Sequence, residues 1–240
     1  MENKTDNAPD TNSVFKVLDE IVKKALEKED IESELMTAYY DFFNKLKETT
    51  GTAAGFNGLS EYLFFQAIRL YLEEHLPCEF EKVKPKNDEG ISIKSKETDP
   101  QIILTRGLKL KAEWAKTTIC PDIVVYKKKE PVAIFEIKVN VSSPDTADKD
   151  VSRYRNNKVP PGIPIYFVFF QPPGGKALKH YTSFLEENPK RAYAILGDPK
   201  EFPEPWRSKG EAGRDELREP SDKCKSLENA LKKLAMDCKG

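Results

Sequence analysis

The chain has 240 residues, of which 38% are hydrophobic and 33% are charged. This composition supplies enough apolar side chains for one core and excludes an intrinsically disordered chain. The longest apolar run, 163–170, has the length of a strand and is too short for a membrane span, so we expect no membrane segment.

The N-terminal residues 1–13 are polar and acidic, and we expect them to be disordered. They contain no apolar signal-peptide segment, which favours a cytoplasmic protein. The four cysteines are scattered and form no Cys-x-x-Cys pair, so four reduced thiols are favoured over a zinc site. The sequence has neither a phosphate-binding glycine motif nor a nucleophile motif, which argues against nucleotide-loop folds and Ser/His or Cys/His hydrolases.

Charge is distributed unevenly around a net value of −1. Residues 1–34 contain 5 Lys or Arg and 10 Asp or Glu, whereas residues 106–158 contain 12 Lys or Arg and 7 Asp or Glu, giving −5 and +5. A basic middle segment fits a nucleic-acid-binding protein better than the net charge alone.

Apolar residues at helical spacing predict three helices in the first third of the chain, over about 14–25, 31–46 and 59–76. The first two form a predicted hairpin, and the third ends before Pro77. Residues 82–100 are charged and irregular, with a short strand at 91–93. The period then changes and predicts three strands, at 101–114, 122–126 and 132–139, with a turn over 127–131.

The second half alternates helices and strands. Ser143 and Pro144 have the pattern of a helix cap and a first helical residue, which predicts a helix to about Asn157. The run 163–170 is typical of a strand buried on both faces, and a helix at 176–187 and a strand at 192–196 follow. Residues 199–220 contain four prolines and indicate a linker, and the helix predicted from 221 either docks on the core or forms a short dimer seam.

Chemistry concentrates on the predicted hairpin between Pro121 and Lys138. Side chains alternate along a strand, so Glu136 and Lys138 project from one face while Phe135 and Ile137 fill the other. Asp122 begins the neighbouring strand and can therefore reach Glu136. Two nearby carboxylates repel unless a cation lies between them, and such oxygens are ligands for hard divalent cations. The alternative is a hairpin whose Glu and Lys are simply solvated.

These residues resemble the motif of the PD-(D/E)xK nuclease superfamily, the fold of many restriction endonucleases, Holliday-junction resolvases and repair exonucleases. Pro121-Asp122 matches the first half of the motif and Glu136-Ile137-Lys138 the second. The family order of helix, three-strand meander, helix and strand agrees with the elements predicted over about 59–171. The resemblance implies that Asp122 and Glu136 bind the metal, expected to be Mg²⁺ or Mn²⁺, with the carbonyl of Ile137 a further candidate ligand. Lys138 would then orient the attacking water or stabilise charge that develops on the phosphoryl oxygens.

Two other regions supply candidate residues. Glu61 shares an apolar helix face with Phe65 and Ile68, and many superfamily members carry an acidic residue on this helix; the alternative is a carboxylate that complements the helix dipole. The helix after the third strand offers cations and an aromatic residue for nucleic acid, or a solvated face: Lys149, Arg153, Tyr154, Arg155 and Lys158. Exonuclease-type branches carry Gln-x-x-x-Tyr here, whereas this chain has Asp150 before Tyr154. Gln171, after the buried strand, either contacts the site or caps the strand.

We therefore expect a three-layer α/β, restriction endonuclease-like domain over 14–198 with a mixed central sheet, an N-terminal helical hairpin, and a linker and C-terminal helix over 199–240. The expected function is metal-dependent hydrolysis of phosphodiester bonds, most readily in DNA, with Glu61, Asp122, Glu136 and Lys138 as the catalytic residues. The alternative is a catalytically inactive nuclease-like module that binds nucleic acid or protein. A homodimer is compatible with either.

Overall fold

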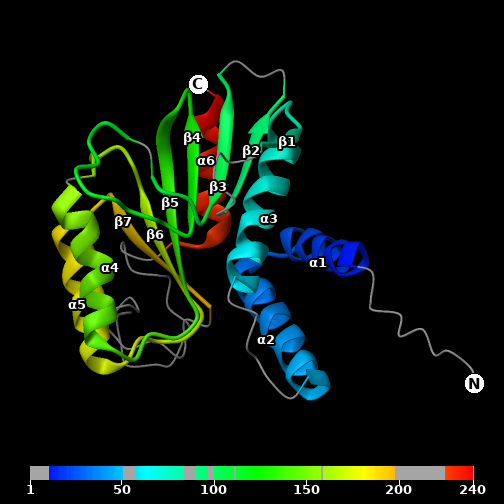
Figure 1. Cartoon of the computed structure of the whole chain (residues 1–240), viewed down its shortest axis with the longest axis horizontal. Helices are drawn as coiled ribbons and strands as arrows, with labels where there is room; N and C mark the ends of the chain where they lie inside the picture. The colour runs from blue at the N-terminus through cyan, green and yellow to red at the C-terminus, as the bar shows by residue number, and fades with distance from the viewer. Residues whose placement is uncertain are drawn as a thin grey trace, which may run out of the picture.

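The computed structural model describes residues 11–50, 58–83, 90–96, 100–110, 112–157, 159–197 and 225–239. These residues form an α/β fold in which one mixed seven-stranded sheet has helices on both faces (Figure 1). In chain order the strands are β1 (Phe80–Val83), β2 (Ile91–Ser95), β3 (Ile102–Arg106), β4 (Ile123–Lys127), β5 (Glu130–Lys138), β6 (Ile165–Phe169) and β7 (Ala192–Leu196).

The sheet follows chain order from β1 to β7. Strands β1 to β5 form an antiparallel meander, and β5, β6 and β7 are parallel. The parallel part needs crossovers, which are the helices α4 (Pro144–Asn157) and α5 (Gly175–Glu187). All five residues of β6 are buried, as predicted for a strand covered on both faces. The predicted helix beginning at Pro144 is confirmed.

Helices α1 (Thr11–Leu26), α2 (Ile31–Thr50) and α3 (Leu59–His75) confirm the three helices predicted near the N-terminus. Helix α1 begins inside the segment 1–13 that was expected to be disordered, and residues 1–10 lie outside the described residues. The helix α6 (Leu227–Lys239) packs against α3 and β5. The predicted linker over 199–220 and the predicted start of this helix at 221 lie outside the described residues.

Two hydrophobic clusters cover the two faces of the sheet, one on each face. Phe135 and Ile137 of β5 join the cluster formed with α1, α2, α3 and α6, whereas Ile134 joins the cluster formed with α4 and α5. The α6 residues Leu227, Leu231 and Leu234 are buried in the first cluster, so α6 is docked on the core and does not offer this stripe as a dimer seam. In the part of the chain that the structure describes, no helix has the length and apolar character to span a membrane.

The predicted strand 101–114 is wrong beyond Arg106, because Gly107 adopts φ +64° and turns the chain out of the sheet. The chain then runs over the α4-side cluster, where the backbone amide of Leu110 donates to the carbonyl of Ile119. Strand β1 lies partly in the segment predicted to be irregular; it is a short edge strand with little burial, and so has a weak sequence pattern. The predicted turn after β4 is confirmed, with Lys128 and Lys129 at positive φ.

Candidate active site

The predicted motif lies where β4 begins and β5 ends. The register pairs Ile123 with Phe135, so the next step brings Asp122 beside Glu136 on the face covered by α4 and α5. Asp122 Oδ2 accepts a hydrogen bond of 2.6 Å from the backbone amide of Ile137. Local antiparallel pairing therefore brings the two halves of the motif together, as the sequence predicts.

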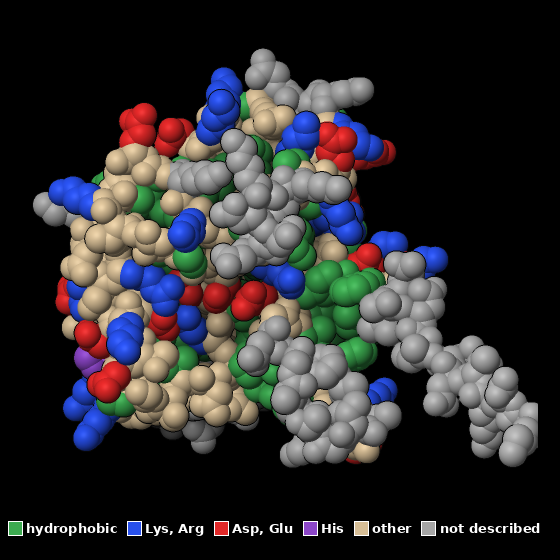
Figure 2. Space-filling view, viewed as in Figure 1, with side chains coloured by type: hydrophobic (Ala, Val, Ile, Leu, Met, Phe, Trp, Pro, Cys, Tyr) green, Lys and Arg blue, Asp and Glu red, His purple; other side chains and the backbone are tan. Residues whose placement is uncertain are grey.

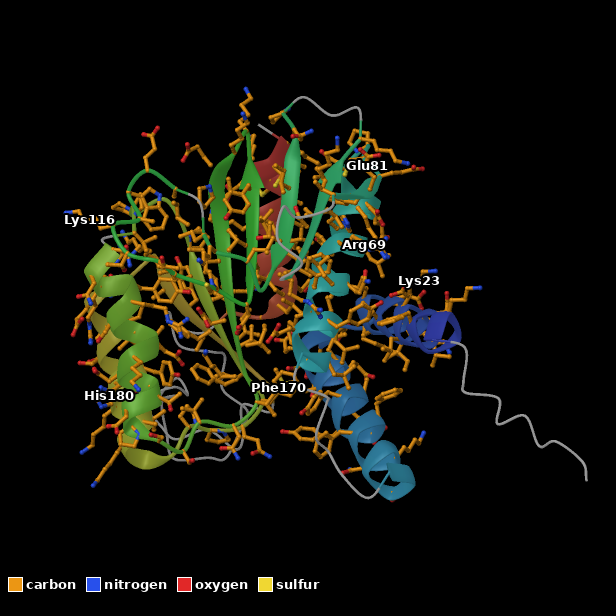
Figure 3. All side chains as sticks on the ribbon, in the orientation of Figure 1. Lys23, Arg69, Glu81, Lys116, Phe170 and His180 are labelled. Atoms are coloured by element: carbon orange, nitrogen blue, oxygen red, sulfur yellow. The ribbon has the colours of Figure 1, made fainter. Side chains whose placement is uncertain are left out.

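The end of β5 is held from the other side by the end of β6. The backbone amide of Phe170 donates to the carbonyl of Lys138 at 2.9 Å. The ring of Phe170, labelled in Figure 3, packs against Tyr39 of α2 and Phe64 of α3, with ring centroids 5.1 and 5.8 Å apart. The backbone at Lys138 is thus fixed through an aromatic cluster, which limits movement of the motif.

Glu136 is fully buried at 0% exposure, and its carboxylate is surrounded by donors. Oε2 lies 2.9 Å from Lys138 Nζ, and Oε1 accepts a hydrogen bond from the hydroxyl of Tyr154. Arg153 Nη1 lies 3.5 Å from the same Oε1. A buried carboxylate is stable only when paired and hydrogen-bonded, and these three donors supply that compensation.

Lys138 bridges two carboxylates. Its Nζ lies 2.9 Å from Glu136 Oε2 and 3.0 Å from Oδ2 of Asp150, a buried residue of α4. Burial acts to lower the pKa of Lys138, but the negative charges of Glu136, Asp150 and Asp122 outweigh it and raise the pKa above its usual value. Lys138 is therefore a permanent cation at neutral pH.

Asp122 differs from Glu136 in having few donors. Burial and the charge of Glu136 raise its pKa from 3.8 to about 7, although Lys138 and the Ile137 amide act in the opposite direction. Glu61 also raises the pKa of Asp122, which places a third carboxyl group within electrostatic reach.

Glu61 lies in the first turn of α3, as predicted, and Arg106 stands beside it at the end of β3. Burial raises the pKa of Glu61, Arg106 lowers it, and Glu136 raises it. Arg106 donates from Nη1 to the carbonyl of Gly58 at 3.1 Å, which ties the start of α3 to the sheet. The structure places Glu61 within electrostatic reach of the motif. Arg106 was not predicted, because no local sequence pattern indicates that the end of β3 lies beside Glu61.

The whole cluster draws side chains from two strands, from the residue just before β4 and from three helices, and it contains four carboxyl groups, three cationic groups and two tyrosines. Its members are Glu61, Arg106, Asp122, Glu136, Lys138, Asp150, Arg153, Tyr154 and Tyr181. In Figure 2, acidic and basic side chains gather at the middle of the face that lies between α3 and α4 in Figure 1. When all four carboxyl groups are ionised they exceed the cations by one, so a further cation would improve the balance of charge.

A divalent metal at this cluster would depend on its carboxylate oxygens. The described residues include no group of three or more His, Cys, Asp or Glu side chains arranged to hold a metal ion. Two oxygen-bearing side chains, Asp122 and Glu136, are nevertheless adjacent, and Glu61 raises the pKa of the first. Hard cations such as Mg²⁺ need few protein oxygens and keep several waters. The chemistry of Asp122 fits such an ion directly, whereas Glu136 would have to exchange one of its present donors.

The predicted nucleic-acid-binding residues of α4 fall into different environments. Lys149 is exposed, Arg155 is partly exposed and pairs with Glu187 at 2.8 Å, and Lys158 lies outside the described residues. Arg153 is 28% exposed and turns towards Glu136 and Asp150. Tyr154 is fully buried with its hydroxyl on Glu136, so its position corrects the expectation of a surface contact.

Gln171 lies outside the cluster, whereas Tyr181 belongs to it. Gln171 follows β6 with an exposed side chain, and the cluster contacts described above do not include it. Tyr181 of α5 donates to Asp150 Oδ2 at 2.7 Å, a contact that depends on how α4 and α5 pack and that no local pattern predicts. Asp150 and Tyr154 are four residues apart on one helix face, and this spacing is the sequence signal for the helical part of the cluster, which consists of Asp150, Arg153, Tyr154 and Tyr181.

Comparison of the chain with known protein families, curated proteins and solved structures finds no match.

Proposed function

We propose that this protein is a metal-dependent nuclease of the restriction endonuclease-like fold, acting on phosphodiester bonds in DNA. The observation that carries the proposal is the convergence of Asp122, just before β4, with Glu136 and Lys138 of β5, within electrostatic reach of Glu61. The helix, meander, helix and strand that surround this point have the order of the PD-(D/E)xK core. A solvated hairpin, the alternative for the motif, would not bury Glu136 completely.

The residues have distinct roles in this proposal. Asp122 and Glu136 hold the metal, the Ile137 carbonyl is a further candidate ligand, and Glu61 adds a third carboxyl group. Bound Mg²⁺ supplies polarisation of the scissile phosphate and a lower pKa for a coordinated water. Lys138 stays protonated because two carboxylates face it, so it acts as a cation that stabilises negative charge on the phosphoryl oxygens and cannot serve as the base.

DNA is the proposed polymer because the segment 106–158 is basic and Lys149 is exposed near the start of α4. Exposed Lys and Arg side chains bind phosphates through a charge interaction that carries no sequence information. This support is weaker than the sequence alone predicted, because Arg153 and Tyr154 face the cluster and Arg155 is paired with Glu187.

The test is a cleavage assay with Mg²⁺ or Mn²⁺ on linear, circular, single-stranded and branched DNA. The wild type should cut at least one substrate, and Glu136→Gln should cut at least about 100-fold more slowly. Glu130→Gln is the matched control, because Glu130 lies on the same strand but is exposed. Equal rates for Glu136→Gln and the wild type would contradict the assignment.

A second candidate is a nuclease-like module that binds nucleic acid or protein without cutting. One observation favours it: both oxygens of Glu136 already have partners inside the protein, and the side chain has no exposed surface. If the wild type binds DNA with metal present but cuts none of the four substrates, this second function replaces the first.

A further inference from the structure

Two acidic residues of the cluster, Glu61 and Asp150, come from helices, and Asp150 is the one that contacts Lys138 directly. It belongs to α4, and its side chain is only 5% exposed. Oδ2 lies 3.0 Å from Lys138 Nζ and accepts a hydrogen bond of 2.7 Å from Tyr181, while Oδ1 pairs with Arg153. Both oxygens are therefore used by donors, which distinguishes Asp150 from Asp122.

The position of the Lys138 ammonium group depends on more than its own strand. A lysine side chain is long and flexible, and loses much rotamer freedom when it is held in one place. Within β5, Glu136 provides one anchor from two residues away. Asp150 provides a second anchor from the helical layer, and Tyr181 of α5 fixes that anchor in turn. The two contacts approach the ammonium group from different elements, so together they restrict it to one location.

We propose that Asp150 is a positioning residue that holds the Lys138 ammonium group beside Glu136, and that Tyr181 orients Asp150 for this purpose. The inference deepens the proposed function, because a cation that acts on a phosphate must be placed within a fraction of an ångström. Asp150 acts through Lys138 and does not itself touch the substrate or the metal.

The first test observes the ammonium group directly and needs no activity. Nitrogen-15 NMR detects lysine ammonium groups that are ordered and exchange their protons slowly. The wild type should give such a signal that is missing in Lys138→Met, and Asp150→Asn should lose it. Asp148→Asn is the matched control, because Asp148 lies on the same helix with a side chain 53% exposed, and it should keep the signal. A signal that persists in folded Asp150→Asn, or a wild type without one, overturns the proposal.

Asp150→Asn removes one partner of a buried ion pair and can prevent folding. In that case Tyr181→Phe tests the positioning role of Asp150, because it removes only the hydroxyl that orients Asp150. It should leave the chain folded and speed proton exchange at Lys138 at least about threefold, on the scale of one lost hydrogen bond. Unchanged exchange in Tyr181→Phe would overturn the proposal.

The second test uses single-turnover DNA cleavage at saturating Mn²⁺. Asp150→Asn should slow cleavage by about 10-fold or more, as expected for a misplaced catalytic group, with little change in DNA affinity. In a Lys138→Met background the same substitution should have no further effect, whereas a merely structural role gives additive losses. If the wild type does not cleave, the proposed function fails, and the NMR result still decides the role of Asp150.

Discussion

The carboxylate of Asp122 lies 2.6 Å from the backbone amide of Ile137 and accepts its hydrogen. This bond joins the residue just before β4 to the peptide unit between Glu136 and Ile137, so the contact that closes this end of the hairpin also brings the two halves of the motif together. Among the residues that the structure describes, the hydrogen bond of Asp122 is made through Oδ2, which leaves the other oxygen for a ligand. The charge of Asp122 can therefore be tested separately from its hydrogen bond.

Asp122→Asn should weaken metal binding strongly and leave the hairpin intact. An amide oxygen still accepts from Ile137, but a neutral side chain is a poor ligand for a hard cation. Calorimetric titration with Mn²⁺ should show binding to the wild type and much weaker binding to Asp122→Asn and Asp122→Ala. Asp148→Asn, an exposed change, should bind as the wild type does. Equal binding by all four proteins would remove Asp122 from the metal site.

Lys149 and Arg153 lie on the same helix but should respond differently to replacement by alanine. Lys149 is exposed, so Lys149→Ala should weaken binding to all DNA sequences alike and reduce the salt slope by about 1. Arg153 contacts Glu136 and Asp150, so Arg153→Ala should lower the free energy of unfolding by about 2 kcal/mol. Salt-dependent binding and urea unfolding measure the two effects, and an unchanged salt slope in Lys149→Ala would make this a solvated helix face.

The sequence predicts the elements that carry the motif because their patterns are local. The hydrophobic periods of α3 and β5, the helix start at Ser143 and Pro144, and the apolar run of β6 are each contained within one element. The short β4–β5 turn fixes which strand pairs with which. From these, the proximity of Asp122, Glu136 and Lys138 follows by counting residues along two strands. The predicted position of Glu61 near the motif depended only on the helix before the sheet beginning at the same edge of the sheet as the motif.

The contacts that α4 and α5 make with the site could not be predicted, because they depend on packing between elements that are distant in sequence. The hydroxyl of Tyr181 meets Asp150 only when α5 packs beside α4, and the two residues are 31 positions apart. Tyr154 reads as a surface residue in a charged helix, yet four-residue spacing from Asp150 turns both towards the sheet. The strand predicted over 101–114 was too long, because apolar residues beyond Gly107 pack against the sheet but do not form a strand of it.

Glu32 should make the protein less stable as the pH rises. It is buried on α2 and accepts a hydrogen bond of 3.1 Å from the backbone amide of Leu227, at the start of α6. Burial raises its pKa from 4.5 to about 7, and the negative charges of Asp30 and Glu228 also raise it. The folded state thus holds the proton more tightly than the unfolded chain, so this carboxyl lowers stability progressively between about pH 4.5 and 7.

Glu32→Gln keeps an acceptor for Leu227 and removes the charge, so it should raise the free energy of unfolding at pH 8. The upper limit is about 3 kcal/mol, from a shift of about 2.5 pKa units. Urea unfolding at pH 4 and pH 8 measures the effect, which should vanish at the lower pH. Glu34→Gln changes an exposed residue of the same helix and serves as the control. A Glu32→Gln variant no more stable than wild type at pH 8 would contradict this prediction.

Lys138 has two separable roles, as a partner for buried carboxylates and as a cation for the phosphate. Lys138→Met keeps most of the aliphatic length and removes the charge. Because Glu136 retains Tyr154 and Arg153 as donors, it is not left alone when Lys138 is neutralised. The variant should therefore fold, although with reduced stability, since Asp150 also loses a partner at 3.0 Å.

The rate distinguishes these roles. If Lys138 stabilises charge on the phosphate, Lys138→Met should still bind Mn²⁺ and DNA but cleave at least about 100-fold more slowly in single-turnover reactions. Its affinity for Mn²⁺ should rise, because a cation 2.9 Å from Glu136 no longer competes with the metal for that carboxylate. Lys127→Met is the control: this residue lies in the same hairpin and binds the carbonyl of Asp237 in α6, at the opposite end of β4 from Asp122. It should cleave at the wild-type rate. Near-wild-type cleavage by folded Lys138→Met would show that Lys138 only balances charge, and would leave Arg106, the cation beside Glu61, as the next candidate for contact with the phosphate.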